Sequence, residues 1–411
     1  MGDPVSEFYT THPYPPPVAN LDRARDEWRD ANRHRAEHHL LWPGTPYRAD
    51  LDILIAGCGT WQAAKYALCR PAAHVVGIDV STTSLDHTEQ LKRKYALTNL
   101  QTRHVSIESV EALGQQFDLI VCTGVLHHLV DPVVGLRALR SVLKPDGRLY
   151  LMVYAPYGRT GIAMLQEYCR TLGVGRSDGE IADLRAAVAA LPPQHPLHTE
   201  LATSRDAQNV DALADALLNP RDQSYSVPEL FDFIARGGVR FTRWYFQAQY
   251  LPECGAFAAT SHASRVARLR PREQYAAMEL WRETMGAHSV VVSRDEVPDA
   301  DVNVRFNDQR WSSFVPIRLA YTMCVEERLP QGAAAVLLNR SHQHRDLLLT
   351  ITPPEKQMFD AIDGQRTIAE IAVHAGLKSA ADCAKTFVEK LWRYDQVVFD
   401  TSGATSSRDL R

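Results

Sequence analysis

Two stretches decide the fold: residues 53–60, Ile53-Leu-Ile-Ala-Gly-Cys-Gly-Thr60, and residues 76–79, Val76-Gly-Ile-Asp79. Each begins as an apolar run of the kind that forms a strand covered on both faces. The first run ends in a Gly-Cys-Gly turn, where glycine lets the backbone approach a ligand closely. The second ends on an acid about 20 positions later, which can bind ribose hydroxyls. Together they predict a nucleoside-cofactor site.

Strands and helices are predicted to alternate beyond these two stretches as well. Apolar runs predict strands over residues 51–56, 74–80, 101–105, 117–123 and 148–154, and helices fill most gaps, with a turn at Lys144-Pro-Asp-Gly147. Two closing strands are expected at residues 239–246 and 288–293. The pattern predicts an α/β fold, a Rossmann-like seven-stranded and mostly parallel sheet.

The alternation of strands and helices stops in two regions, and these regions divide the chain. Residues 156–225 carry helical patterns without a convincing strand, and we expect them to form a helical cap insertion. The first domain then covers residues 1–295. Residues 296–411 predict a small α+β, winged-helix-like domain with a hairpin (334–338 and 347–351) and three helices.

Composition excludes several classes of protein. The 411 residues are 45% hydrophobic and 23% charged, a balance that excludes a disordered or coiled-coil chain. A net charge of -4 favours no nucleic-acid partner, and no apolar run is long enough to span a membrane. Seven scattered cysteines without a CxxC motif, and an N-terminus unlike a signal peptide, indicate reduced thiols in a cytoplasmic protein.

Candidate catalytic and substrate-binding residues gather near the ends of the predicted strands. His127 and His128 follow the fourth strand and are candidates for a general base, although they could equally buttress the next helix. Aromatic residues flank the expected mouth, where they could stabilise a cation or pack as a lid; they are Tyr9, Tyr14, Tyr154 and Tyr157, the last two beside Arg159. No metal site is predicted, because His342 and His344 read as a solvated hairpin turn.

The cofactor class follows from a resemblance. Gln62 stands where a dinucleotide site would have its third glycine, which argues against nicotinamide or flavin. The quoted segments, with Phe117-Asp-Leu-Ile-Val-Cys-Thr-Gly-Val-Leu-His-His-Leu129 and Leu143-Lys-Pro-Asp-Gly-Arg-Leu149, resemble the class I S-adenosylmethionine-dependent methyltransferases over roughly residues 40–155.

The resemblance implies a role for each part of the cofactor site. Its methionine end would lie on Gly57, Cys58 and Gly59, and its ribose on Asp79 and Val80. The adenine would lie beside Ser106, Ile107 and Glu108, and the methyl group beside Thr123 and Gly124. Trp61 replaces a glycine frequent in the family, so its indole must cover the methionine end or change how it is held.

Two further resemblances concern the substrate. The Pro-Tyr-Pro segment around Tyr14, and the stretch 218–230 with Arg221 and Tyr225, are similar to bacterial methyltransferases with a helical cap, including protein-lysine methyltransferases. Residues 359–372 resemble winged-helix peptide-binding domains such as the peptide chaperone of pyrroloquinoline quinone biosynthesis.

These resemblances imply an enzyme that transfers a methyl group from S-adenosylmethionine to a nitrogen or oxygen acceptor. A protein or peptide acceptor is the preferred prediction, with Tyr14, His127 and His128 as catalytic candidates. A small-molecule methyltransferase and a non-catalytic, cofactor-binding regulator are the alternatives. A homodimer is left open.

Overall fold

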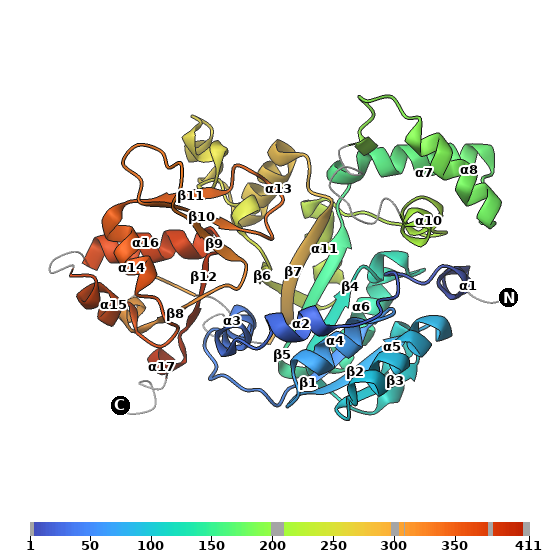
Figure 1. Cartoon of the computed structure of the whole chain (residues 1–411), viewed down its shortest axis with the longest axis horizontal. Helices are drawn as coiled ribbons and strands as arrows, with labels where there is room; N and C mark the ends of the chain where they lie inside the picture. The colour runs from blue at the N-terminus through green and yellow to red at the C-terminus, as the bar shows by residue number, and fades with distance from the viewer. Residues whose placement is uncertain (1–3, 199–208, 297–303, 308, 377–380, 406–411) are drawn as a thin grey trace. The chain divides into compact units, whose positions relative to one another are not determined.

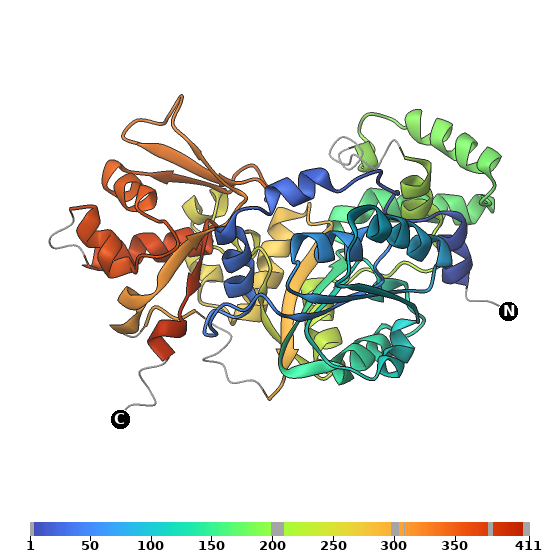
Figure 2. The ribbon, with the colours of Figure 1, turned by 60° about the horizontal axis from the view of Figure 1, so that its bottom comes forward.

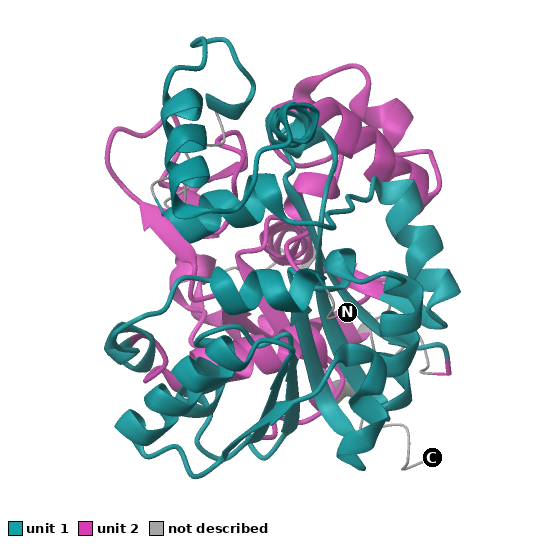
Figure 3. Ribbon diagram, turned by 90° about the vertical axis from the view of Figure 1, so that its right-hand side faces the viewer, with its two compact units in different colours: residues 1–26, 49–241, 283–295 teal, residues 27–48, 242–282, 296–411 magenta. Residues whose placement is uncertain are grey.

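The computed structural model describes residues 4–198, 209–296, 304–307, 309–376 and 381–405 (Figure 1). The chain divides into two compact units (Figure 3). Unit 1 comprises residues 1–26, 49–241 and 283–295, and unit 2 comprises residues 27–48, 242–282 and 296–411. Unit 2 therefore includes two segments that precede residue 296. The assignment of two domains, 1–295 and 296–411, stays a prediction.

A seven-stranded sheet is the centre of the fold, with the order β3-β2-β1-β4-β5-β7-β6. Its strands are β1 (Asp52–Ala56), β2 (His74–Asp79), β3 (Leu100–His104), β4 (Phe117–Thr123), β5 (Leu143–Tyr154), β6 (Val239–Trp244) and β7 (Ala287–Arg294). The pairs from β3 to β5 are parallel, whereas β7 runs antiparallel to β5. The predicted Rossmann-like sheet is confirmed.

Helices of unit 1 cover both faces of this sheet (Figure 2), which explains why its central strands are apolar throughout. The connecting helices are α4 (Gln62–Cys69), α5 (Thr82–Tyr95), α6 (Pro132–Ser141) and α11 (Val227–Arg236), and α1 (Pro4–Thr11) and α2 (Asp22–Glu27) precede the sheet. The turn predicted at Lys144–Gly147 is wrong: these residues lie inside β5, whose register with β4 shifts between Phe117 and Leu119. The extra residues form an irregularity in the strand instead of a separate turn.

The expected cap region contains three described helices, α7 (Thr160–Leu172), α8 (Asp178–Ala189) and α10 (Val210–Leu218). They share an apolar core that includes Leu165, Ile181 and Leu217, and Phe8 of α1 packs into it. Apart from one isolated bridge between Tyr154 and Ser224, the described part of this region has no strand pairing. The helical cap insertion over residues 156–225 stays a prediction.

Unit 2 contains two small sheets. One has the order β11-β10-β9 and the other pairs β12 with β8, all antiparallel. Their strands are β8 (Val315–Arg318), β9 (Thr322–Val325), β10 (Ala335–Asn339), β11 (Leu348–Ile351) and β12 (Val397–Asp400), and the unit's helices are α3 (Ala31–Leu41), α12 (Ala263–Val266), α13 (Pro271–Arg282), α14 (Pro353–Asp360), α15 (Ile368–His374), α16 (Ala381–Arg393) and α17 (Ser402–Thr405). The predicted hairpin is confirmed, and the winged-helix likeness stays a prediction.

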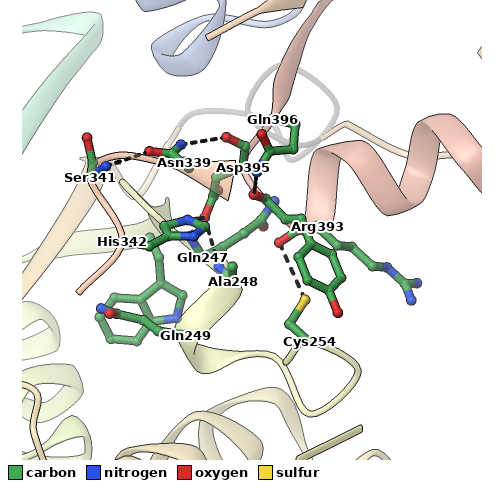
Figure 4. A network of polar contacts seen from close by, with 12 residues as sticks. Gln247, Ala248, Gln249, Cys254, Asn339, Ser341, His342, Arg393, Asp395 and Gln396 are labelled. Carbon is green, nitrogen blue, oxygen red and sulfur yellow. Dashed lines mark hydrogen bonds and ion pairs between the residues drawn. The ribbon is translucent and has the colours of Figure 1, made fainter. Parts of the chain in front are cut away.

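A buried carboxylate organises the interior of unit 2 (Figure 4). Asp395 accepts hydrogen bonds from the main-chain N–H groups of Gln247 (3.1 Å) and Ala248 (2.9 Å), and His342 Nε2 lies 3.1 Å from its Oδ2 atom. The prediction of a solvated turn at His342 is therefore wrong, because its side chain is only 5% exposed. Buried carboxyl groups are normally hydrogen-bonded in this way.

None of the helices in the described ranges is both long enough and apolar enough to cross a lipid bilayer. The cytoplasmic location stays a prediction.

Candidate functional site

A cavity of about 390 Å³ opens at the carboxyl ends of β1, β2, β4 and β5 in unit 1. Parallel strands end at this edge of the sheet, so the residues that follow them meet there. The lining includes most of the residues predicted from sequence; they are Tyr9, Tyr14, Gly57, Gly59, Trp61, Asp79, Val80, Ser106, Ile107, Glu108, Thr123, Gly124, His128 and Tyr154.

The glycine turn forms one wall of the cavity. Gly57 and Gly59 have φ angles of +71° and +55°, which side-chain-bearing residues rarely adopt. A Cβ atom on Gly57 would clash with Val125 Cγ2, and one on Gly59 would lie 2.9 Å from the carbonyl oxygen of Tyr14. Both glycines are therefore required by close approach as well as by conformation.

Asp79 braces that same turn. Its Oδ2 atom accepts a hydrogen bond from the Gly59 N–H (2.8 Å), and its Oδ1 atom accepts one from the Ser81 N–H (2.9 Å). Burial raises the pKa of the Asp79 carboxyl, and the main-chain donors oppose that shift. Each carboxylate oxygen has two acceptor positions, so Asp79 retains capacity for a ligand hydroxyl.

Cys58, inside the glycine turn, and Trp61, just after it, differ in whether their side chains line the cavity. Trp61 lines the cavity, and Lys65 Nζ lies 5.6 Å from the centre of its ring. Cys58 does not line the cavity: its thiol is buried against the main chain of Gly77, and burial raises its pKa. Cys58 holds the turn from within: its N–H donates to the Ile78 carbonyl (2.9 Å), and its thiol donates to the Gly59 carbonyl (3.7 Å).

The opposite ends of the cavity carry the other predicted contacts. Val80 and residues 106–108 follow β2 and β3. Thr123 and Gly124 end β4, and Gln62 Nε2 donates a hydrogen bond to Thr123 Oγ1 (3.1 Å). A cradle of two glycines beside an accepting carboxylate fits a nucleoside cofactor with a methionine tail.

Three tyrosines and one histidine also line the cavity. They are Tyr9, Tyr14, Tyr154 and His128. The Tyr9 hydroxyl donates to Asp215 Oδ1 (2.7 Å) and accepts from Asn219 Nδ2 (2.9 Å), so its phenol is fixed in place. Burial, then the charge of Asp215, raises the Tyr9 pKa.

The paired histidines have different surroundings. His128 lines the cavity, and its Nδ1 atom lies 2.6 Å from the Arg221 carbonyl oxygen. His127 does not line the cavity: its ring is fully buried, with its centre 4.0 Å from that of Tyr154. Burial lowers the pKa of His127 well below the ordinary value, and the neighbouring His128 and Arg159 add to the effect.

Four of the predicted substrate residues do not line this cavity. Arg159 is paired with Asp222 (2.8 Å) and lies over the Tyr154 ring at 3.5 Å. Arg221 lines a second cavity, of about 430 Å³, in the cap region. Tyr225 stacks on Phe233 at 5.1 Å, and Tyr157 is 40% exposed.

Several lining or supporting residues were missed from sequence. Gln62, Val125 and Met152 line the cavity, and Asp215 and Asn219 hold Tyr9. One signal was available for Asp215, since it is a carboxylate within an apolar helical run, Ala212 to Leu218.

Comparisons with known proteins agree with this geometry. A family described as "Methyltransferase domain" matches residues 54–149. An uncharacterized protein of Synechococcus sp. is 29% identical over 306 residues, covering 72% of this chain and 73% of that protein. A ubiquinone biosynthesis O-methyltransferase of Haemophilus ducreyi is 31% identical over 153 residues, and the match spans 33% of this chain but only 61% of that enzyme.

The solved structures extend the likeness in fold. PKMT2 from Rickettsia typhi matches with a TM-score of 0.61 at 14% identity, over 93% of this chain and 75% of that one. Its complex with AdoHcy matches with a TM-score of 0.59, over 89% and 73%.

The sheet order and the family match define the class: the chain contains a class I methyltransferase domain that uses S-adenosylmethionine. The protein is accordingly a methyltransferase enzyme.

Proposed function

We propose that this enzyme transfers the methyl group of S-adenosylmethionine to a nitrogen or oxygen atom of a protein or peptide. One observation carries the proposal: a single cavity joins the glycine turn and Asp79 to a wall of three tyrosines and His128. The first part suits the cofactor, and the second offers aromatic faces and one imidazole to an acceptor.

The cofactor's place in the cavity follows from the chemistry of the lining. Its methionine end would lie on Gly57 and Gly59, with Trp61 beside it, and the ribose would donate to Asp79. Residues 106–108 would flank the adenine. Thr123 and Gly124 would then lie near the transferable methyl group, facing the tyrosine wall.

S-adenosylmethionine supplies an already activated methyl group when bound. The chain's own residues therefore act mainly by position and by excluding water. Tyr9 is held by Asp215 and Asn219, and His128 is held at the Arg221 carbonyl. Rings fixed in this way can orient an acceptor nucleophile along the line of displacement at little entropic cost.

Two observations support a protein or peptide acceptor. The fold likeness to PKMT2, a protein-lysine methyltransferase, spans 93% of this chain and so includes most of unit 2. Unit 2 also has a three-stranded sheet whose outer strands, β9 and β11, present edges on which an extended peptide can add a strand.

A small-molecule acceptor is the second candidate. The named relatives that are ubiquinone biosynthesis O-methyltransferases favour it. The matched segment covers only 59–61% of the length of those two enzymes, so the likeness concerns the cofactor part.

Tritium transfer separates the two candidates. The full chain is incubated with S-adenosylmethionine carrying a tritiated methyl group and with two fractions of a cell lysate, one of protein and one of metabolites. We expect labelled protein bands after denaturing gel electrophoresis. The label should be lost when Tyr9 and His128 are replaced together. Label confined to the metabolite fraction would refute the protein acceptor.

A further inference from the structure

Two imidazoles and a carboxylate meet at the border of the cavity, and of the three residues only His128 lines it. His127 and His128 belong to the short turn after β4, and Asp222 lies in the loop after α10. One ligand-type atom from each residue lies within 4.8 Å of those of the other two. The fold thus brings together three metal-ligating side chains from distant parts of unit 1.

The polar atoms of this cluster divide into two sets. His128 Nδ1 is engaged with the Arg221 carbonyl, and Asp222 Oδ2 accepts from Arg159 and from Gln166, each at 2.8 Å. Within the described part of the chain, the remaining atoms are buried and have no hydrogen-bond partner; they are His127 Nδ1 and Nε2, His128 Nε2 and Asp222 Oδ1. A buried polar atom left unpaired costs about 1–3 kcal/mol, so a set of four calls for a ligand.

The engaged atoms prepare the unpaired ones for ligation. A His128 N–H at Nδ1 directed to a carbonyl leaves the lone pair on Nε2, which is how metal-binding histidines are commonly oriented. In the same way, Arg159 and Gln166 donate to one oxygen of Asp222 and leave its Oδ1 atom available as a ligand. The Arg159 charge is shared between that carboxylate and the Tyr154 ring, 3.5 Å away.

We propose that His127, His128 and Asp222 bind one divalent transition-metal ion, with zinc as the best fit. Two imidazole nitrogens and one carboxylate oxygen favour such ions over magnesium or calcium. Ligand atoms around zinc are roughly 3.4 Å apart, given bonds of about 2.1 Å, so small side-chain rotations suffice.

The site would act on the cavity through His128, which lines it. Three protein ligands leave a coordination position for water or an acceptor oxygen, and a bound metal lowers the pKa of that oxygen. The proposal does not depend on the proposed function, because metal binding is measured without any acceptor.

Metal titration tests the site directly. The full-length protein is freed of metal by a chelator, then titrated with zinc by calorimetry and with cobalt by visible absorption. We expect one ion per chain and the absorption of tetrahedral or five-coordinate cobalt. Asp222→Asn and His128→Ala should each weaken binding at least about tenfold, with unchanged circular dichroism.

His12→Ala is the matched control. That histidine also lies close to a carboxylate, Asp211, at 3.1 Å in unit 1, but it is outside the cluster. The variant should bind the ion as the wild type does. The proposal is overturned if the wild type binds no stoichiometric ion, or if Asp222→Asn and His128→Ala bind it as tightly as His12→Ala. S-adenosylmethionine binding to the metal-free protein reports separately on the cofactor site.

Discussion

Asp79 illustrates how single residues in this cavity have more than one task. Sequence reasoning assigned it to the ribose, and the structure adds two main-chain donors, from Gly59 and Ser81. Its carboxylate therefore fixes the shape of the glycine turn before any ligand arrives. A cradle held in advance lowers the ordering cost of binding.

Tyr9 and Asp215 give the first prediction at this scale. The charge-assisted bond between them (2.7 Å) fixes the phenol in the cavity wall, where we propose that the acceptor binds. Asp215→Asn should lower kcat by about 10- to 100-fold, equivalent to roughly 1.5–3 kcal/mol, with the affinity for S-adenosylmethionine changed less than about threefold. Turnover and calorimetry on the same preparation measure both.

The exposed Tyr157 supplies the control for this prediction, since it does not line the cavity. Tyr157→Phe should leave both quantities unchanged. A parallel loss of cofactor affinity in Asp215→Asn would indicate a merely structural role and contradict the prediction.

Most residues that line the cavity were predictable from the sequence, whereas the residues that hold Tyr9 in place were not. Gly57, Gly59 and Asp79 follow directly from strand ends, whose position is visible in the hydrophobic pattern. Asp215 and Asn219 reach Tyr9 only through the long excursion of the chain into the cap. Spacing along the sequence carries no information about such contacts.

At the scale of elements, Asp131 caps the first turn of α6. Asp131 Oδ1 accepts from the N–H groups of Val133 (2.9 Å) and Val134 (3.2 Å), and Pro132 occupies the first turn. Asp131→Ala should lower the free energy of unfolding by about 1 kcal/mol, because two helix-end donors lose their acceptor. Urea denaturation measures this, and Asp86→Ala, on the exposed side of α5, should cause no loss.

The α3 helix yields a pH prediction. Burial, followed by the neighbouring His39, lowers the His38 pKa from 6.5 to about 4. The His38 side chain therefore binds a proton more tightly in the unfolded chain than in the folded one. As the pH falls from about 6.5 towards 4, this difference lowers the free energy of unfolding by up to about 3 kcal/mol. Urea denaturation at several pH values should show a shallower pH dependence for His38→Gln, and an identical slope would contradict the assignment.

Elements of unit 2 show where pattern reading stops. The hairpin β10–β11 was visible because both strands are mostly apolar, whereas β8 and β9 were missed. Each missed strand has four residues, and β8 contains Pro316. Proline weakens the strand signal of β8, and both segments become strands by pairing, β8 with β12 and β9 with β10. Short length alone does not explain the miss, because β11 also has four residues and was predicted.

At the scale of the molecule, the chain segments that form unit 2 determine how its role can be tested. Its core joins Ala248 and Cys254 to residues beyond 334, so truncation at residue 296 would expose apolar surface and destroy the unit. Point substitutions on its exposed strand edges are the suitable test.

Charge on both edges should block addition of a peptide strand. Met323 on β9 and Leu348 on β11 are 39% and 47% exposed. The double variant Met323→Lys/Leu348→Lys should lower kcat/KM for a protein acceptor by about tenfold, about 1.4 kcal/mol, and leave cofactor affinity unchanged. Val373→Lys, on the exposed face of α15, is the control. Equal activity of the two variants would argue against docking at a strand edge.

Calorimetric titration of S-adenosylmethionine into the full chain tests the central claim, that the cavity at the glycine turn is the cofactor site. We predict one binding event per chain, competed by S-adenosylhomocysteine and weakened at least about tenfold in Asp79→Ala, because the acceptor for the ribose is lost. Asp22→Ala, an exposed acid of α2, should bind normally. No binding by the wild type, or undiminished binding by Asp79→Ala, would contradict the account.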